Sequence, residues 1–530
     1  MGGFFGAELK RAGFDAVIVE GRADKPVYLW VHDGEAEIRD ASHLWGSNTK
    51  ECQEAIRQEL GDRLIRMAHI GPGGENMVRI ASVINDVSHS AGRTGMGAVM
   101  GSKNLKAIAA RGRKAPSLAD PAKVSEMAKW MTANHLQLSR GMHEYGTGAA
   151  MVGGNAQGNL PVRNYSDGFF EEVEQITAET LKNTLRVGME SCYACPVRCK
   201  KVVEAEQPYK IDRIYGGPEY ETLGSFGSAC GVSDLAAVCK ANELCAAYSL
   251  DTISAGMTIA FAMECYEKGI ISKADTGGIE LRFGNGEAMV QMVDQMAYRR
   301  GFGDILAEGS RLAARRIGRG AEDLAMHVKG VEIPMHEPRL KQGLGLTYSV
   351  EAHGADHTAS MHDTMFSAEA AGIQEARAFG ILDPLPSNDL GPAKVRLAKE
   401  MHQWRLFLDS VSICSFVRWN YNQVIDMVRA TTGWNTSLAE ASMVGERIVT
   451  MARAFNMREG LTAADDQLPK RFFSPTPRGA LKETAIDPAA MHKAIHTFYR
   501  MMGWNDQTGV PTAEKMQELG IGWAVESLAR

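Results

Sequence analysis

Three closely spaced cysteines are the strongest chemical signal in this sequence. Cys192, Cys195 and Cys199 have the spacing C-x2-C-x3-C, which lets thiolates converge on neighbouring irons of one cluster. Zinc is the rival interpretation, because C-x2-C is also half of a zinc site. Zinc usually takes a second close pair, and no C-x2-C or H-x3–5-H pair follows shortly downstream. The spacing therefore favours an iron–sulfur cluster and leaves its fourth ligand open.

Two further segments carry residues that could bind or react. The stretch Gly92–Gly101 is rich in glycine, and Arg93 could neutralise a phosphate that the backbone approaches. Its spacing matches neither a P-loop nor a dinucleotide-binding fingerprint, so a tight hairpin is an equally good interpretation. The carboxylate of Glu221 could act as a general base or simply lie at a helix N-terminus. Position alone favours the second role.

Histidines gather in one part of the chain. Five of the fourteen fall between residues 327 and 362: His327, His336, His353, His357 and His362. Such clustering indicates metal or proton chemistry. The spacing is not the H-E-x-x-H of zinc hydrolases, which makes a hydrolase a weak interpretation.

The composition excludes some classes of function. The chain has 530 residues, 45% hydrophobic and 23% charged, with a net charge of −6. This balance gives no basic footprint for nucleic acid. We find no apolar run of about 18 residues that would span a membrane, and no signal peptide at the N-terminus. We therefore expect a cytoplasmic protein whose cysteines are ligands or buried thiols rather than disulfides.

The elements that must position these residues are predicted to be strands in the first part of the chain and helices in the rest. Short β-rich runs (AVIVEG, PVYLWV, EAEIRD and KNLKAIAARG) dominate residues 1–115. Helical periodicity dominates the rest, which is too long for one unit. We place an internal boundary near the polar stretch 318–326, giving helical regions 116–322 and 323–530.

Read in order, these segments resemble the tungsten-containing aldehyde ferredoxin oxidoreductase family. The segments that carry the resemblance are GGFFGAELKRAGFDAVIVEGRADKPVYLWV, IGPGGEN, GRTGMGAVMGSKNLKAIA, CYACPVRC, GPEYET, LDTISAG, GFGDILAEGS and DSVSIC. The resemblance implies an α+β fold, in which a partial β-sandwich-like cofactor-binding domain precedes two largely α-helical domains.

The resemblance also implies a site. It makes Cys414 the fourth ligand of a [4Fe–4S] cluster with Cys192, Cys195 and Cys199, and it places Glu221 and His357 beside a tungsten (or molybdenum) held by two pterins. The implied cofactor contacts are His89, Ser90, Gly92, Arg93, Asp251, His353, Asp409 and Ile413.

Several positions depart from the family pattern. Ser412 replaces a glycine, Ala246 replaces a first pterin-contacting aspartate, and His89 stands where an arginine is common. The E-x-x-H iron site of the family dimer interface reads Lys240-Ala-Asn-Glu243, so we expect no bridging iron, while a homodimer stays open. Family members also carry a stretch before the Gly-Gly-Phe-Phe segment, so we expect a truncated member with an incomplete first domain.

The function implied is oxidation of an aldehyde to a carboxylic acid, with electrons passed through the cluster to ferredoxin or an iron–sulfur subunit. One alternative is a related tungsten enzyme such as a benzoyl-CoA reductase catalytic subunit, in which Cys230 is the candidate metal ligand. The other is a non-catalytic iron–sulfur protein degenerated from the family.

Overall fold

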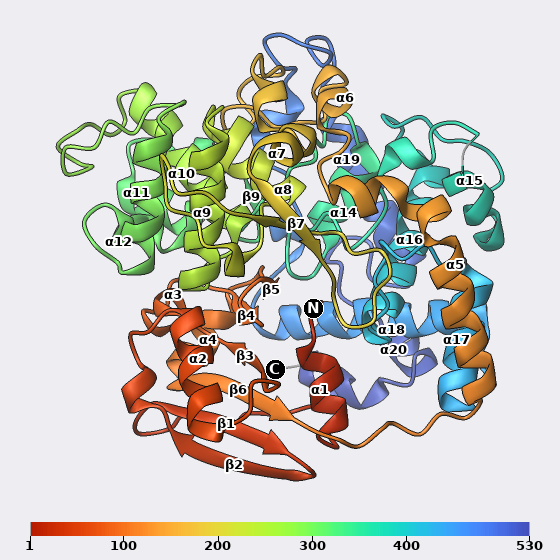
Figure 1. Ribbon diagram of the computed structural model, residues 1–530. Helices are drawn as coiled ribbons and strands as arrows, with labels where there is room; N and C mark the ends of the chain where they lie inside the picture. The colour runs from red at the N-terminus through yellow and green to blue at the C-terminus, as the bar shows by residue number, and fades with distance from the viewer. Residues whose placement is uncertain (1, 370, 529–530) are drawn as a thin grey trace.

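The N-terminal region is built around one mixed sheet. The computed structural model describes residues 2–369 and 371–528. The six strands run in the order β2-β1-β6-β3-β4-β5, with only β1 and β6 parallel. Their bounds are β1 Val27–His32, β2 Glu35–Asp40, β3 Arg66–His69, β4 Val83–Asn85, β5 His89–Ala91 and β6 Leu105–Arg111. Figure 1 shows β1 and β2 at the outer margin and β4 and β5 next to the helical part.

A helix covers each face of this sheet. Side chains of a strand alternate between faces, so Met67 packs with helix α2 (Thr49–Leu60) while its neighbour Ala68 packs with Phe5 of α1 (Phe5–Arg11). Asn48 and Glu51 form a capping box that fixes the start of α2. The sheet is therefore a two-sided platform whose last strand, β5, faces the rest of the molecule.

The remainder is mostly helical, with two small hairpins. These are β7 Arg186–Glu190 with β8 Lys200–Val203, and β9 His327–Val328 with β10 Val331–Glu332. The helices are α3 Pro72–Glu75, α4 Met96–Ser102, α5 Pro121–Tyr145, α6 Met151–Ala156, α7 Ala178–Thr184, α8 Tyr220–Thr222, α9 Leu235–Tyr248, α10 Thr252–Glu267, α11 Gly286–Ala297, α12 Gly303–Leu306, α13 Gly309–Ile317, α14 Gln342–Val350, α15 Ala371–Ala376, α16 Pro392–Ser410, α17 Tyr421–Thr432, α18 Leu438–Arg458, α19 Pro488–Met501 and α20 Ala513–Glu518.

Helix α10 lies in the centre of the main core. Every residue from Ile253 to Cys265 is buried, which is typical of a helix surrounded on all sides. It packs against α9, α11, α13 and the π-helical segment Leu223–Gly227 that follows α8. Gly256 permits the last contact, because a Cβ there would lie 2.7 Å from the Cβ of Ser225. The segment after α8 is thus held directly against the core.

The α+β class predicted from the sequence is confirmed, with two local corrections. The run AVIVEG, predicted as a strand, has no regular secondary structure. The stretch after Gly92 is not a hairpin but enters helix α4. In this helix, a Cβ on Gly97 would lie 2.3 Å from the carbonyl oxygen of Ser82, so the backbones approach closely there. Among the described residues, no helix is both long and apolar enough to cross a membrane.

Candidate active site and metal centre

The three clustered cysteines lie on the loop that joins β7 to β8. Two residues of this loop, Ala194 and Arg198, adopt positive φ angles of 52° and 53°, which curl the backbone tightly. The amide of Cys195 donates to the carbonyl of Cys192 at 3.2 Å, and Arg198 donates to the carbonyl of Met189 at 3.1 Å. The loop is therefore preshaped by its own hydrogen bonds.

Cys414 comes to the same place from the loop after α16. Burial raises the pKa of Cys199 to about 12, and negative charge on Glu219, Cys414 and Cys192 contributes. Desolvation likewise raises the pKa of Cys414, and the thiolates of Cys195 and Cys192 add to it. The other cysteines of the group thus add to the raised pKa of Cys199 and of Cys414, and a bound metal would relieve this repulsion between thiolates. The structure thus unites the four predicted ligands.

The start of the chain closes over this group. A Cβ on Gly2 would lie 2.8 Å from the sulfur of Cys192 and 3.7 Å from the ring of His89. The amide of Tyr193 donates to the carbonyl of Gly3 at 3.1 Å. Burial, and next the charge of Lys200, lowers the pKa of His89 to about 4. His89 is therefore a neutral imidazole beside the cysteines.

The loop after β5 meets the N-terminus of α10. A Cβ on Gly92 would lie 3.5 Å from Oγ of Ser90 and 3.6 Å from Oδ1 of Asp251. Arg93 places Nε 3.6 Å from Oδ2 of Asp251 and donates to the carbonyls of Ala355 and Glu332. Two buried nitrogens in this region, Nε of Arg93 and Nε2 of His89, have no hydrogen-bond partner among the residues that the structure describes. Such orphaned groups call for a ligand.

His353 and Asp409 lie in the same charged neighbourhood. His353 contacts Glu351 through Nδ1 at 3.0 Å and Asp356 through Nε2 at 2.9 Å. Although burial opposes it, the hydrogen bonds to Asp356 and Glu351 raise the pKa of His353 to about 10. Burial, and next the charge of Asp356, raises the pKa of Asp409. Ile413 lies apart from this group, lining a cavity of about 110 Å³ together with Cys414 and His362.

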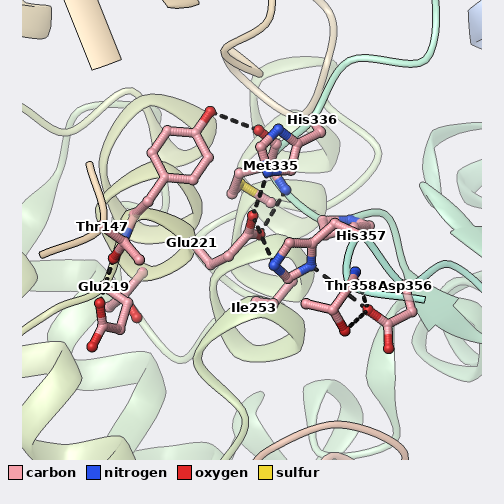
Figure 2. Close-up of polar contacts among 12 residues, drawn as sticks. Thr147, Glu219, Glu221, Ile253, Met335, His336, Asp356, His357 and Thr358 are labelled. Carbon is pink, nitrogen blue, oxygen red and sulfur yellow. Dashed lines mark hydrogen bonds and ion pairs between the residues drawn. The ribbon is translucent and has the colours of Figure 1, made fainter. Parts of the chain in front are cut away.

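Glu221 and His357 meet, and a second histidine joins them. Glu221 is 9% exposed, and its Oε2 accepts the amide of Met335 at 2.8 Å. Its Oε1 lies 3.2 Å from Nε2 of His336 and 3.5 Å from Nε2 of His357. Figure 2 shows both rings turned toward this carboxylate. Burial, and next the charge of Lys341, holds the pKa of His336 well below its ordinary value.

Sequence reasoning missed three residues of this site. The clustering of histidines includes His336 but assigns it no role, although it lies closer to Glu221 than His357 does. Asp356 and Lys341 carry no local signal; Asp356 contacts His353, and Lys341 contacts His336 at 3.1 Å. Only the packing of residues 335–341 against 356–362 reveals them.

Comparison with known proteins decides the family. A model described as "Aldehyde ferredoxin oxidoreductase, N-terminal domain" matches residues 1–112, and one for domains 2 and 3 matches residues 123–521. The chain belongs to the aldehyde ferredoxin oxidoreductase family. The predicted resemblance is therefore confirmed, and the mixed sheet corresponds to the family's N-terminal domain.

Relatives match nearly the whole chain. It is 37% identical over 528 residues to the tungsten-containing aldehyde ferredoxin oxidoreductase of Pyrococcus furiosus, covering 98% of this chain and 84% of the relative. The protein of the same name from Pyrococcus abyssi is 38% identical over 531 residues, with the same coverage. A solved structure, the active site complex BamBC of benzoyl coenzyme A reductase with 1,5-dienoyl-CoA, superposes with a TM-score of 0.79 at 26% identity, covering 99% of this chain and 84% of that one.

Proposed function

We propose that this protein is a tungsten-dependent oxidoreductase that converts aldehydes to carboxylic acids and passes the electrons through a [4Fe–4S] cluster. The observation that carries the proposal is that Glu221, His357 and the four cysteines are brought together in a chain of this family. The names of the relatives at 37% and 38% identity point to the same metal, substrate class and ferredoxin acceptor.

The residues present fit both cofactors. Cys192, Cys195, Cys199 and Cys414 supply the all-thiolate set that an iron–sulfur cluster needs, with raised pKa values at Cys199 and Cys414. The pterins would be held by His89, Ser90, Gly92, Arg93, Asp251, His353 and Asp409. The unpartnered buried donors of His89 and Arg93 and the open backbone at Gly92 suit anionic phosphates. Ile413 stays a predicted contact.

The protein's own part is acid–base chemistry and positioning. When bound, the metal bispterin takes the two electrons of the oxidation and the cluster passes them on singly. Glu221 accepts a proton from the water that attacks the aldehyde carbon, and His357 donates a hydrogen bond to the aldehyde oxygen. Glu221 is held for this by a neighbour, because the amide of Met335 donates to one of its oxygens. The products are a carboxylic acid, two electrons and two protons.

Two alternatives have less support. In a benzoyl-CoA reductase-like enzyme Cys230 would ligate the metal, but its thiol is fully buried in the main core and donates to the carbonyl of Gly256 at 3.4 Å. A degenerate protein without tungsten would not need Glu221 and His357, which are retained and in contact with one another.

The test is an assay after anaerobic expression with tungstate. We expect about four irons and one tungsten per chain, as the proposed [4Fe–4S] cluster and single tungsten require, and aldehyde-dependent reduction of ferredoxin. Glu221→Gln should lower kcat by about 10² to 10⁴-fold, the range for loss of a general base. Glu179→Gln, which alters an exposed residue of α7, is the matched control. Zinc in place of iron, or dienoyl-CoA formation without aldehyde oxidation, would contradict the proposal.

Three finer statements stay predictions. They are the domain boundaries at 115/116 and 322/323, the cytoplasmic location and a homodimer. A homodimer would lack the family's bridging iron, because Lys240 pairs with Glu243 at 2.6 Å where that site would be.

A further inference from the structure

Lys341 is a buried cation in an unfavourable place. It is 5% exposed and forms the N-cap of helix α14, where the helix dipole is positive. In the described part of the chain no carboxylate oxygen lies within 4.0 Å of its ammonium. A buried charge without an ion-pair partner is expensive. Stability alone therefore does not explain why a lysine occupies this position.

The contacts of its ammonium are two imidazoles. Nζ of Lys341 lies 3.1 Å from Nδ1 of His336 and 3.1 Å from Nδ1 of His362. An ammonium has three donors and no acceptor, so both Nδ1 atoms must accept. In a neutral imidazole the proton then sits on Nε2. Burial, together with the charge of Lys341, lowers the pKa of both histidines well below the ordinary value, which keeps the rings neutral.

This tautomer matters because of what His336 faces. Its Nε2 lies 3.2 Å from Oε1 of Glu221, an oxygen without an aligned hydrogen-bond donor among the described residues. An N–H at Nε2 attracts this carboxylate oxygen, whereas a lone pair there would repel it. The ring of His336 also stacks on that of His357, with centroids 5.4 Å apart. The tautomer of His336 thus decides whether an N–H or a lone pair faces Glu221.

We propose that Lys341 is a positioning residue of the active site, which fixes His336 in the Nε2–H tautomer and so presents an N–H to the carboxylate of Glu221. His362 is fixed in the same way. Its ring lies 4.3 Å from that of His336 and borders the cavity that also reaches Cys414. The ammonium therefore orders both rings between Glu221 and this cavity.

The charges around Lys341 define the pH range in which it can act. Burial lowers the pKa of Lys341 to about 8, against the attraction of Asp363 and Glu221. Asp363 is itself paired with Lys394 at 2.7 Å, and Arg405 faces His362 from α16. Above about pH 8 the amine gains a lone pair and can accept as well as donate, so the tautomer is no longer fixed.

Ring-nitrogen NMR tests the tautomer without any assay of activity. In protein labelled with ¹⁵N in the histidine rings, with signals assigned by His336→Gln and His362→Gln, both rings should show Nε2–H at pH 7. Lys341→Met should move His336 toward Nδ1–H, while Lys106→Met, which removes an equally buried lysine from the sheet, should leave both signals unchanged. Persistence of Nε2–H in Lys341→Met would overturn the proposal.

Should that variant fail to fold, a pH titration of the wild-type protein through pH 8 takes its place. Loss of the Nε2–H tautomer above pH 8 would support the proposal, and its retention would overturn it.

Kinetics then link the tautomer to catalysis, an arm that rests on the function proposed above. For equal metal content, Lys341→Met should lower kcat about 10- to 100-fold, the usual effect of losing a residue that orients a ligand or base, with little change in KM. The alkaline limb near pH 8 should disappear from its profile. An unchanged profile with only a lower melting temperature would contradict a positioning role. Wild-type protein that oxidises no aldehyde would refute the proposed function and leave the NMR result standing.

Discussion

The charge of His353 is set by its surroundings. It contacts Glu351 on one side and Asp356 on the other, and those hydrogen bonds raise its pKa from 6.5 to about 10. Against the effect of burial, the same contacts lower the pKa of Asp356. An imidazolium between two carboxylates is therefore the resting state near neutral pH.

His353→Gln should lower stability in a pH-dependent way. Because the folded pKa of about 10 exceeds the unfolded value of 6.5, the contribution of His353 is complete below pH 6.5 and is lost as the pH rises through 10. Denaturant unfolding of both proteins from pH 6 to pH 10.5 should show their free energies converging. A constant difference across this range would mean that His353 acts through packing and not through charge.

At the scale of elements, the segment that carries Glu221 depends on one close contact. Helix α8 runs into the π-helical Leu223–Gly227, which lies against Gly256 of α10. Short π-helical segments occur often at functional sites. Here the widened turn is supported by α10, in which every residue from Ile253 to Cys265 is buried.

Gly256→Ala should disturb this support. The new methyl would lie 2.7 Å from the Cβ and 2.8 Å from the backbone carbon of Ser225, which costs about 1–3 kcal/mol when the core cannot give way. Chemical denaturation and kcat should both report the shift of Glu221. Gly141→Ala in α5, where nothing lies within 4 Å of the new methyl, is the matched helix control. Equal stability of the two variants would refute the tight contact.

The loop that carries Cys414 holds a strained residue. Ser412 has a φ of 57°, a conformation that costs a side-chain-bearing residue about 1–2 kcal/mol relative to glycine. Ser412→Gly should therefore raise the free energy of unfolding by up to about 1 kcal/mol, since glycine also gains entropy in the unfolded chain. Calorimetry on the metal-free protein would measure it. A loss of stability would show that the serine makes a contact worth more than the strain.

The sequence predicts elements better than contacts. Strand β2 is expected at its observed bounds, because a short β-rich run such as EAEIRD is a local signal. The prediction for AVIVEG is wrong because a run of β-branched residues forms a strand only when a partner strand is available. The meeting of Cys414 with Cys199 follows from family resemblance, since spacing cannot specify a ligand from so distant a segment.

Local sequence patterns could not predict the contacts among the acid–base residues. Glu221 and His357 follow from the family, but His336 and Lys341 contribute through the way the loop before α14 packs on the loop before Asp363. Nothing in the local pattern of a buried lysine distinguishes it from a surface one. Its unusual position at a helix N-terminus becomes visible only when the helix is known to start there.

At the scale of the whole molecule, the four cysteines join two distant halves of the chain. Cys414→Ser should therefore reduce bound iron as severely as Cys192→Ser does, although its segment carries no other cysteine of the group. Iron analysis and the visible absorption of the cluster would measure this. Cys239→Ser, which alters a buried thiol of α9, should keep its iron. Full iron content in Cys414→Ser would remove it from the donor set.

The split donor set also orders events during biosynthesis. The β7–β8 loop leaves the ribosome long before α16 and the loop that follows it, because chains are made and folded from the N-terminus. A nascent chain therefore exposes three thiols for some time without the fourth. If the four cysteines hold the proposed cluster, its assembly can be completed only after the segment that carries Cys414 has been made.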